Sequence, residues 1–147
     1  MARFRGIYPH TIDSKGRLSV PNRFRDALRA EETDQLVVTL GNNGCLAVYP
    51  KDAWLKAEED VDNLPAGQAK DHFIRHFISP AQDVQLDKTG RILVPVQLRA
   101  EVGLDKDVLV VGTLNKFEIW DRDGYAKYLE TSRDQARQLL ETQNVRM

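Results

Sequence analysis

Two arginines follow turn glycines in nearly identical settings, and their guanidinium groups are the side chains best placed to do chemistry. Arg17 ends the stretch DSKGR at positions 13–17, and Arg91 ends DKTGR at positions 87–91. An arginine can donate two parallel hydrogen bonds to guanine O6 and N7 in the major groove of DNA. Alternatively, each arginine pairs with the aspartate of its own stretch and stabilises only the turn. The two roles are compatible, because an ion pair can also orient a guanidinium group.

Other basic residues are candidates for contacts with DNA phosphates, which add affinity and salt dependence without selecting a sequence. These residues are Lys15, Lys88, Arg3, Arg5 and, at the edge of the group, Arg23. Within the two stretches, a carboxylate can accept backbone N–H bonds and a glycine can adopt a positive φ without strain. The residues that we expect to shape the turns, without contacting bases, are Asp13, Gly16, Asp87 and Gly90.

No arrangement of residues predicts a metal site, a cofactor site or an enzyme. His72 and His76 stand four apart, a spacing that can hold a metal, but no third ligand accompanies them, so an exposed helix face is favoured. Residues 121–124 (DRDG) resemble the start of a calcium loop but lack its remaining ligands, so a helix cap is favoured. Cys45 is the single cysteine, and no nucleophile has a partner base.

The chain contains an internal repeat that must position these residues. DSKGRLSVP at 13–21 and DKTGRILVP at 87–95 match at an offset of 74 residues. LAVYPKDAW at 46–54 resembles FEIWDRDGY at 117–125 at an offset of 71, so the first copy has three extra residues, which we place within 30–34. Two copies indicate a duplicated domain, because a solenoid needs at least three repeats. Trp54 and Trp120 lie at matching positions and are predicted to pack in the core.

Each copy is predicted to form strand, turn, strand, short helix, two strands and a helix. Pro21 and Pro95 favour helix starts, and Gly103 favours the end of the second short helix. The predicted extended segments and hairpins cover 4–12, 18–20, 36–49, 84–86, 92–94 and 108–120, and the longer helices cover 50–61, 66–77 and 122–141. We therefore predict a first domain at 3–62, a joining helix within 63–80, a second domain at 81–141 and a frayed tail at 142–147.

The chain of 147 residues has a net charge of −1, but its charges are unevenly distributed. Residues 1–29 carry seven Lys or Arg against two Asp or Glu, and residues 72–100 carry four against two. Such blocks can form one basic face, although charges also cluster by accident. Neither a run of ~20 apolar residues nor a secretory signal is present, and one cysteine suits a reducing compartment, so we expect a cytoplasmic protein.

The sequence Asp-x-x-Gly-Arg followed by Val-Pro, between strands and before a helix that starts with proline, resembles the AbrB-like swapped-hairpin domain. Two copies in a chain of this length resemble the MraZ family from residue 4 to about residue 140. The resemblance implies an α+β fold of two tandem swapped-hairpin β-barrel half-domains related by a pseudo-twofold axis, with flanking helices. It also implies a ring-like homo-oligomer that binds double-stranded promoter DNA on the nucleoid. Such a protein regulates the division and cell-wall gene cluster through short repeated sites.

Two other functions stay open from the sequence. An antitoxin-like protein-interaction module could use the acidic stretch at 58–62, although both halves are predicted to be fully folded. RNA binding would need aromatic side chains beside the basic blocks, and none is evident. The turns also differ at Ser14 against Lys88 and at Lys15 against Thr89, so they need not contact DNA equally.

Overall fold

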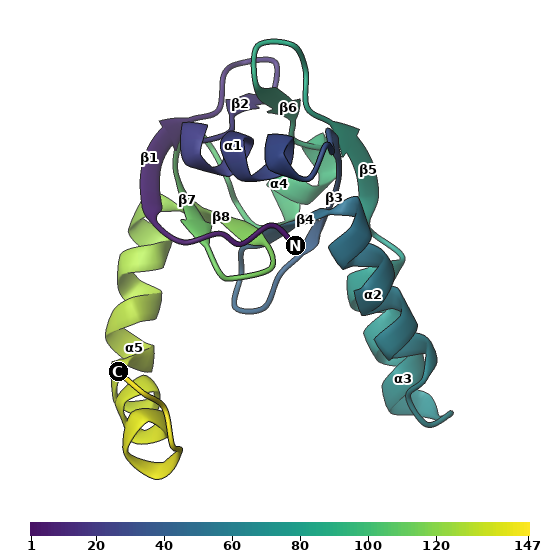
Figure 1. Cartoon of the computed structure of the whole chain (residues 1–147), viewed down its shortest axis with the longest axis vertical. Helices are drawn as coiled ribbons and strands as arrows, with labels where there is room; N and C mark the ends of the chain where they lie inside the picture. The colour runs from purple at the N-terminus through teal and green to yellow at the C-terminus, as the bar shows by residue number, and fades with distance from the viewer.

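The structure, a computed structural model, describes residues 1–147 and contains eight strands and six helical segments (Figure 1). The strands are β1 Ile7–Thr11, β2 Arg17–Ser19, β3 Gln35–Leu40, β4 Leu46–Pro50, β5 Gln82–Gln85, β6 Arg91–Leu93, β7 Asp107–Gly112 and β8 Phe117–Asp121. The helices are α1 Asn22–Ala30, α2 Lys51–Asp62, α3 Gln68–Phe73, the π-helix η1 Ile74–Ile78, α4 Val96–Glu101 and α5 Arg122–Thr142. None of these helices is long and apolar enough to span a membrane.

The two repeats share their strands. The middle layer is an antiparallel sheet of six strands in the order β1-β7-β8-β4-β3-β5, and β2 pairs with β6 in a separate two-stranded sheet. The first strand of each repeat pairs with the hairpin of the other repeat: β1 pairs with β7, and β5 pairs with β3. If each strand is replaced by its equivalent in the other repeat, the same strand order is obtained, read from the opposite edge of the sheet. The topology therefore has a pseudo-twofold axis.

This exchange joins the two predicted half-domains in one common sheet. Neither repeat closes a barrel by itself, because β8 of one repeat pairs with β4 of the other in the middle of the common sheet. The physical reason lies in the turn at 13–17, which carries β2 away from the sheet to pair with β6. The main hydrogen-bonded partners of β1 therefore come from the other repeat. The mixed α+β content and the tandem repeat agree with the prediction.

The main hydrophobic core lies between the six-stranded sheet and a cap formed by β2, β6, α1 and α4 (Figure 1). Three aromatic rings meet in it: the ring centroids of Phe4 and Phe24 are 5.2 Å apart, and those of Phe4 and Phe117 are 5.4 Å apart. Phe24 and Leu28 form the buried side of α1, and Leu98 is the buried residue of α4. The cap is thus fixed to the sheet by residues that match in the repeat.

The opposite face of the sheet carries the longer helices. Trp54 of α2 packs against Tyr49, with 5.3 Å between ring centroids, and Trp120 packs against Tyr128 of α5 at 4.8 Å. Both tryptophans are at most 5% exposed, which confirms their predicted core role. Beyond these contacts α2, α3 and α5 extend away from the sheet as two separate arms (Figure 1).

Most local predictions are confirmed, with shifts at element ends. Prolines precede α1 and α4, and Gly103 ends α4 with a φ of +67°. The Asp121 carboxylate accepts the Gly124 N–H at 2.9 Å, so residues 121–124 form the predicted helix cap. The strands β2 and β6 each begin one residue earlier than predicted, at their arginines, because the two strands pair with each other.

Two predicted elements need larger corrections. The first strand begins at Ile7 instead of residue 4, because Gly6 has a φ of +111° and interrupts the extended chain. The joining helix begins at Gln68 and changes at Ile74 into a π-helix. Within this π-helix, the Phe77 carbonyl accepts a hydrogen bond from the Thr39 hydroxyl of β3 at 2.6 Å. One backbone carbonyl of the helix is therefore bonded to the sheet.

Candidate nucleic-acid interface

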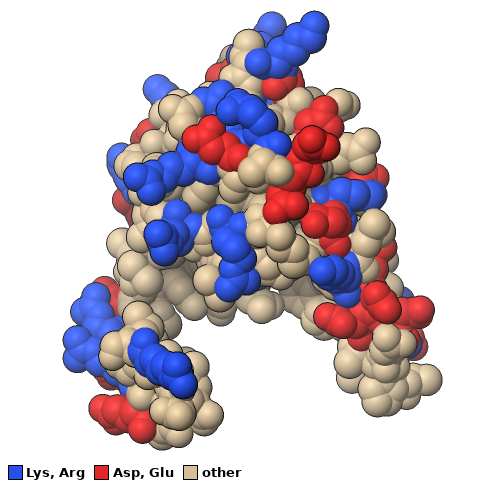
Figure 2. Space-filling model, viewed as in Figure 1, with Lys and Arg blue, Asp and Glu red and all other residues tan.

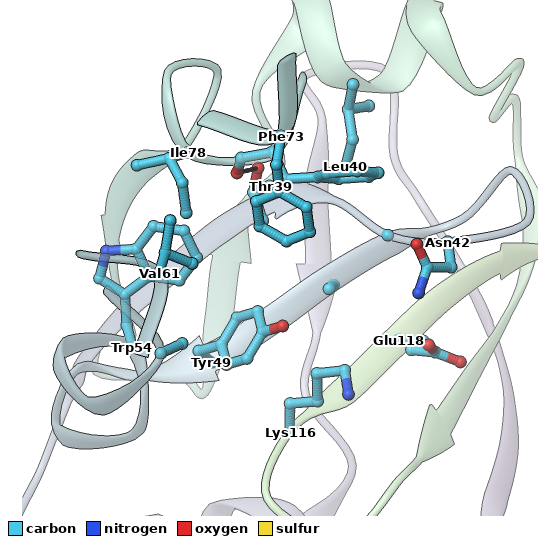
Figure 3. Close-up of a pocket in the computed structure, with 14 residues that line it drawn as sticks. Thr39, Leu40, Asn42, Tyr49, Trp54, Val61, Phe73, Ile78, Lys116 and Glu118 are labelled. Carbon is cyan, nitrogen blue, oxygen red and sulfur yellow. Dashed lines mark hydrogen bonds between the residues drawn. The ribbon is translucent and has the colours of Figure 1, made fainter. Parts of the chain in front are cut away.

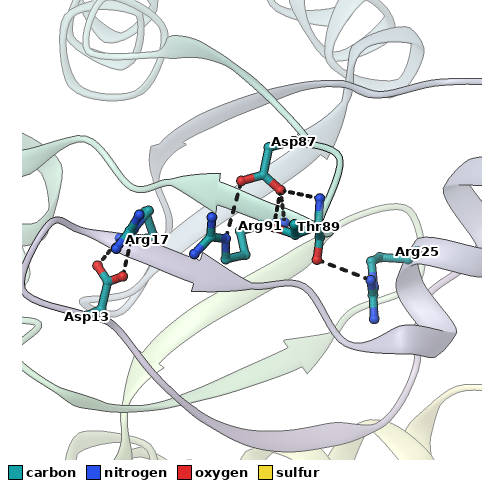
Figure 4. Close-up of polar contacts among 6 residues, drawn as sticks. All are labelled: Asp13, Arg17, Arg25, Asp87, Thr89 and Arg91. Carbon is teal, nitrogen blue, oxygen red and sulfur yellow. Dashed lines mark hydrogen bonds and ion pairs between the residues drawn. The ribbon is translucent and has the colours of Figure 1, made fainter.

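The short ladder between β2 and β6 brings the two turns together (Figure 4). Leu18 and Ile92 face each other in the middle of the ladder and are buried, at 0% and 1% exposure. Because side chains alternate along a strand, their neighbours Arg17 and Arg91 lie on the outer side of the same ladder. The structure thus places both predicted arginines on one outer face.

The first turn is built by Asp13. Its carboxylate oxygen Oδ1 accepts the backbone N–H groups of Lys15, at 3.0 Å, and of Arg17, at 2.9 Å. Gly16 donates its N–H to the Asp13 carbonyl at 2.9 Å and has a φ of +85°, which favours glycine. The N–H bond from Arg17 is the main reason why the pKa of Asp13 is lowered.

The second turn repeats this geometry and adds one bond. Asp87 Oδ1 accepts the N–H groups of Thr89 and Arg91, each at 2.9 Å, and also the Thr89 hydroxyl at 2.8 Å. These bonds, first the Arg91 N–H and then the Thr89 hydroxyl, lower the pKa of Asp87 to about 2. Lys15 replaces Thr89 in the first turn, so the two turns are not chemically identical.

Each arginine is held by its own aspartate through one atom. Arg17 Nε donates to Asp13 Oδ2 at 2.7 Å, and Arg91 Nε donates to Asp87 Oδ2 at 3.3 Å. The arginine side chains are 37% and 34% exposed. The ion-pair alternative from the sequence is therefore present in the structure. It leaves the terminal Nη1 and Nη2 groups without protein partners, and those groups can donate in parallel to a planar acceptor.

Two further arginines, which sequence reasoning did not assign to the site, support the turns from the opposite repeats. Arg25 of α1 donates from Nη1 to the Thr89 carbonyl at 3.5 Å and covers Gly90. A Cβ on Gly90 would lie only 2.5 Å from Arg25 Cδ. The sequence does show Arg25 and Arg99 as matching residues, four positions after Pro21 and Pro95, but not the direction in which they reach.

Arg99 of α4 has the equivalent position beside the first turn. Its Nε donates to the Val94 carbonyl at 3.2 Å, and a Cβ on Gly16 would lie 2.9 Å from its Nη2. The Val94 N–H in turn donates to the Gly16 carbonyl at 2.8 Å. The first turn is therefore packed against the second repeat, as the second turn is packed against the first.

The remaining predicted basic residues fall into two places. Lys15 and Lys88 are exposed within the turns and have no ion-pair partner in the chain. Arg3 and Arg5 flank Phe4, whose N–H donates to the Leu114 carbonyl at 2.7 Å, so they lie on the N-terminal segment apart from the turns. They line a hollow beside α1 together with Arg23. Basic side chains gather over the left and centre of the cap, whereas acidic ones lie on its right-hand side and on the α2–α3 arm (Figure 2).

A hydrophobic pocket lies on the other side of the six-stranded sheet, between α2, η1 and β4 (Figure 3). Its walls include Tyr49, Trp54 and Phe73, and Lys116 lies at its edge with Nζ 5.7 Å from the Tyr49 ring centroid. Two of its polar side chains are already bonded: the Thr39 hydroxyl donates to the Phe77 carbonyl, and Glu118 accepts the Trp120 Nε1–H at 2.9 Å. No three His, Cys, Asp or Glu side chains are grouped to hold a metal ion, and His72 and His76 are exposed.

The fold and the paired turns define a class: an internally duplicated α+β protein with an arginine-bearing face shared by its two repeats. The family model of the MraZ protein, described as antitoxin-like, matches the chain twice, at residues 3–74 and 77–146. This chain belongs to the MraZ family, as its two Asp-x-x-Gly-Arg motifs predicted.

Three relatives illustrate the similarity, and each has the name transcriptional regulator MraZ. The protein of Lachnoclostridium phytofermentans is 46% identical over 120 residues, which cover 82% of each chain. The Moorella thermoacetica protein is 42% identical over 139 residues, or 94% of each chain. The protein of Acidovorax sp. strain JS42 is 43% identical over 122 residues, which cover 83% of this chain and 84% of its own. The family consists of transcriptional regulators and not of enzymes, in agreement with the sequence prediction.

Proposed function

We propose that this protein regulates transcription by binding double-stranded DNA sequence-specifically through the outer face of β2 and β6. The observation that supports this most directly is that Arg17 and Arg91 are each held through Nε while their Nη groups are free. The major groove admits a two-stranded β-ribbon, and an arginine fork matches guanine O6 and N7. Asp13 and Asp87 shape the turns and orient the two forks.

The other basic residues contact DNA phosphates in this proposal. Lys15 and Lys88 contact phosphates beside the groove, and Arg3 and Arg5 contact phosphates further along the duplex, so these four provide affinity and salt dependence. The exchange of first strands between repeats is, in this proposal, the swapped-hairpin arrangement of AbrB-like domains. It presents both turns to one duplex.

The proposed operator is the set of short promoter repeats of the division and cell-wall gene cluster, bound by a ring-like homo-oligomer on the nucleoid. The helix α5 supports self-assembly, because none of its 21 residues is buried and Leu129, Leu139 and Leu140 are 40–58% exposed. Several subunits on one ring bind several repeats at once, and the effective concentration of each later contact is raised.

Binding measurements on the promoter fragment and on unrelated DNA of equal length, at two salt concentrations, test the proposal. We expect Arg17→Ala and Arg91→Ala each to weaken promoter binding by about 5- to 150-fold, from about 1–3 kcal/mol per bidentate contact. Lys70→Ala on α3 removes the same charge far from the face and from α5, and serves as the control for net charge, with sedimentation to check oligomer size. Undiminished binding by the double variant, or equal affinity for both DNAs, would reject the proposal.

A protein partner on α5 is the second candidate, because its exposed leucines suit an apolar contact and the family is described as antitoxin-like. The two candidates are separated by the same measurement. A wild-type protein that binds neither DNA at low salt would favour the protein partner.

A further inference from the structure

The outer face of β2 and β6 is not symmetric, although the backbone that carries it is. Arg17 lies opposite Leu93 across the ladder, and Arg91 lies opposite Ser19. Ser19 and Leu93 are equivalent residues of the two repeats, 74 positions apart. One arginine therefore has an aliphatic neighbour, and the other has a hydroxyl neighbour.

Leu93 is exposed in a position where the chain offers it no partner. It is 59% exposed, whereas the next residue inward, Ile92, is 1% exposed. The same change from polar to apolar occurs three residues later, where Val96 is 66% exposed and its equivalent in the first repeat is Asn22. The second repeat thus has exposed aliphatic residues at both positions, whereas the first repeat has polar residues there.

The spacing of the ladder relates Leu93 to the DNA. Residues opposite each other in an antiparallel pair have Cβ atoms about 5 Å apart, and successive base pairs are separated by about 3.4 Å. If Arg17 contacts a guanine, Leu93 is within reach of the neighbouring base pair. The only apolar group on a base edge in the major groove is the 5-methyl group of thymine.

We propose that Leu93 contacts the 5-methyl group of a thymine next to the base pair contacted by Arg17, whereas Ser19 makes no such contact beside Arg91. This inference rests on the proposed function. It gives the bound site a direction, because the two halves of one chain then prefer different base steps.

The test uses the promoter fragment amplified with either dTTP or dUTP, so that the two duplexes differ only in their thymine methyl groups. We expect the wild-type protein to bind the deoxyuridine duplex at least about fourfold more weakly, the factor that corresponds to burial of one methyl group. Leu93→Ser should bind both duplexes with equal affinity, and Ser19→Leu should increase the ratio. Leu114→Ser alters a leucine of similar exposure, 60%, away from the face and should keep the wild-type ratio.

Each contrary outcome is distinguishable. Equal wild-type affinity for the two duplexes, with promoter preference retained, overturns the role of Leu93 and leaves the proposed function intact. A ratio that persists in Leu93→Ser assigns the methyl contact elsewhere and also overturns the inference. A change of oligomer mass in Leu93→Ser makes this residue a contact between copies and has the same consequence. Failure to bind the thymine duplex rejects the proposed function itself.

Discussion

Replacement of Gly90 by alanine should destabilise this protein much more than the same replacement at Gly44. Both glycines have positive φ angles, +80° and +84°, so an alanine at either position has a similar backbone strain. They differ in their surroundings. An added Cβ on Gly44 would meet nothing within 4 Å, whereas one on Gly90 would lie 2.5 Å from Cδ and 2.7 Å from Cζ of Arg25.

The expected magnitudes follow from these two contributions. A left-handed conformation costs an alanine about 1–2 kcal/mol. Alanine also lowers the conformational entropy of the unfolded chain, which stabilises the folded state by about 0.4–1 kcal/mol, so the free energy of unfolding of the Gly44 variant should fall by about 1 kcal/mol. Overpacking against Arg25 adds about 1–3 kcal/mol at Gly90. At about 3 °C per kcal/mol for a domain of this size, the melting temperature falls by about 3 °C for the Gly44 variant and about 6–12 °C for the Gly90 variant.

Thermal unfolding followed by circular dichroism, at one protein concentration for all variants, measures these shifts. The Arg25→Ala background supplies the control, because removal of the side chain opens the space. There the Gly90 change should cost only the backbone part, about 1 kcal/mol. The reasoning fails if Gly90→Ala is no more harmful than Gly44→Ala, or if its cost is the same with and without Arg25.

Two further predictions concern titratable groups. The pKa of Asp87 is held at about 2, so the stabilisation from its charge is complete above the ordinary value of 3.8 and is lost as the pH falls through 2. Thr89→Val removes the hydroxyl donor and should raise that pKa in a carboxyl-carbon NMR titration while the pKa of Asp13 is unchanged; an unmoved Asp87 would contradict the assignment. Burial, and next the charge of Glu118, raise the pKa of the Cys45 thiol to about 12. Maleimide at pH 8 should therefore label Cys45 only in denaturant, and rapid labelling of the folded protein would show that the turn between β3 and β4 opens.

The sequence was most informative where the structure is local. The Asp-x-x-Gly turns depend on bonds within five residues, so their shape followed from the residue types at 13–17 and 87–91. The repeat then assigned the same elements to both halves, and this fixed the short helices after Pro21 and Pro95. The joining helix had no equivalent for comparison, and there the π-helix at Ile74–Ile78 was missed.

Contacts between the repeats could not be predicted in the same way. A repeat shows which residues are equivalent, but the same pattern fits a fold in which β1 pairs within its own half and one in which it pairs with β7. The sequence therefore showed Arg25 as a residue with an equivalent, Arg99, in the other copy, but not as the residue that covers Gly90 of that copy. Leu93 lies in the run Ile-Leu-Val, which is typical of a buried strand, and only the ladder register places it outside.

The exchange between repeats also explains what a duplicated chain gains over two identical subunits. Each turn is packed by an arginine of the other repeat, and β2 needs β6 as its partner, so neither half can present its arginine alone. Two identical chains would satisfy these contacts equally well, but they would carry the same residue at positions 19 and 93. Once the halves are joined, these two positions can differ while the buried pair Leu18 and Ile92 keeps the ladder in register. The asymmetry is confined to side chains on the exposed face, where it changes what the face can bind at little cost to the fold.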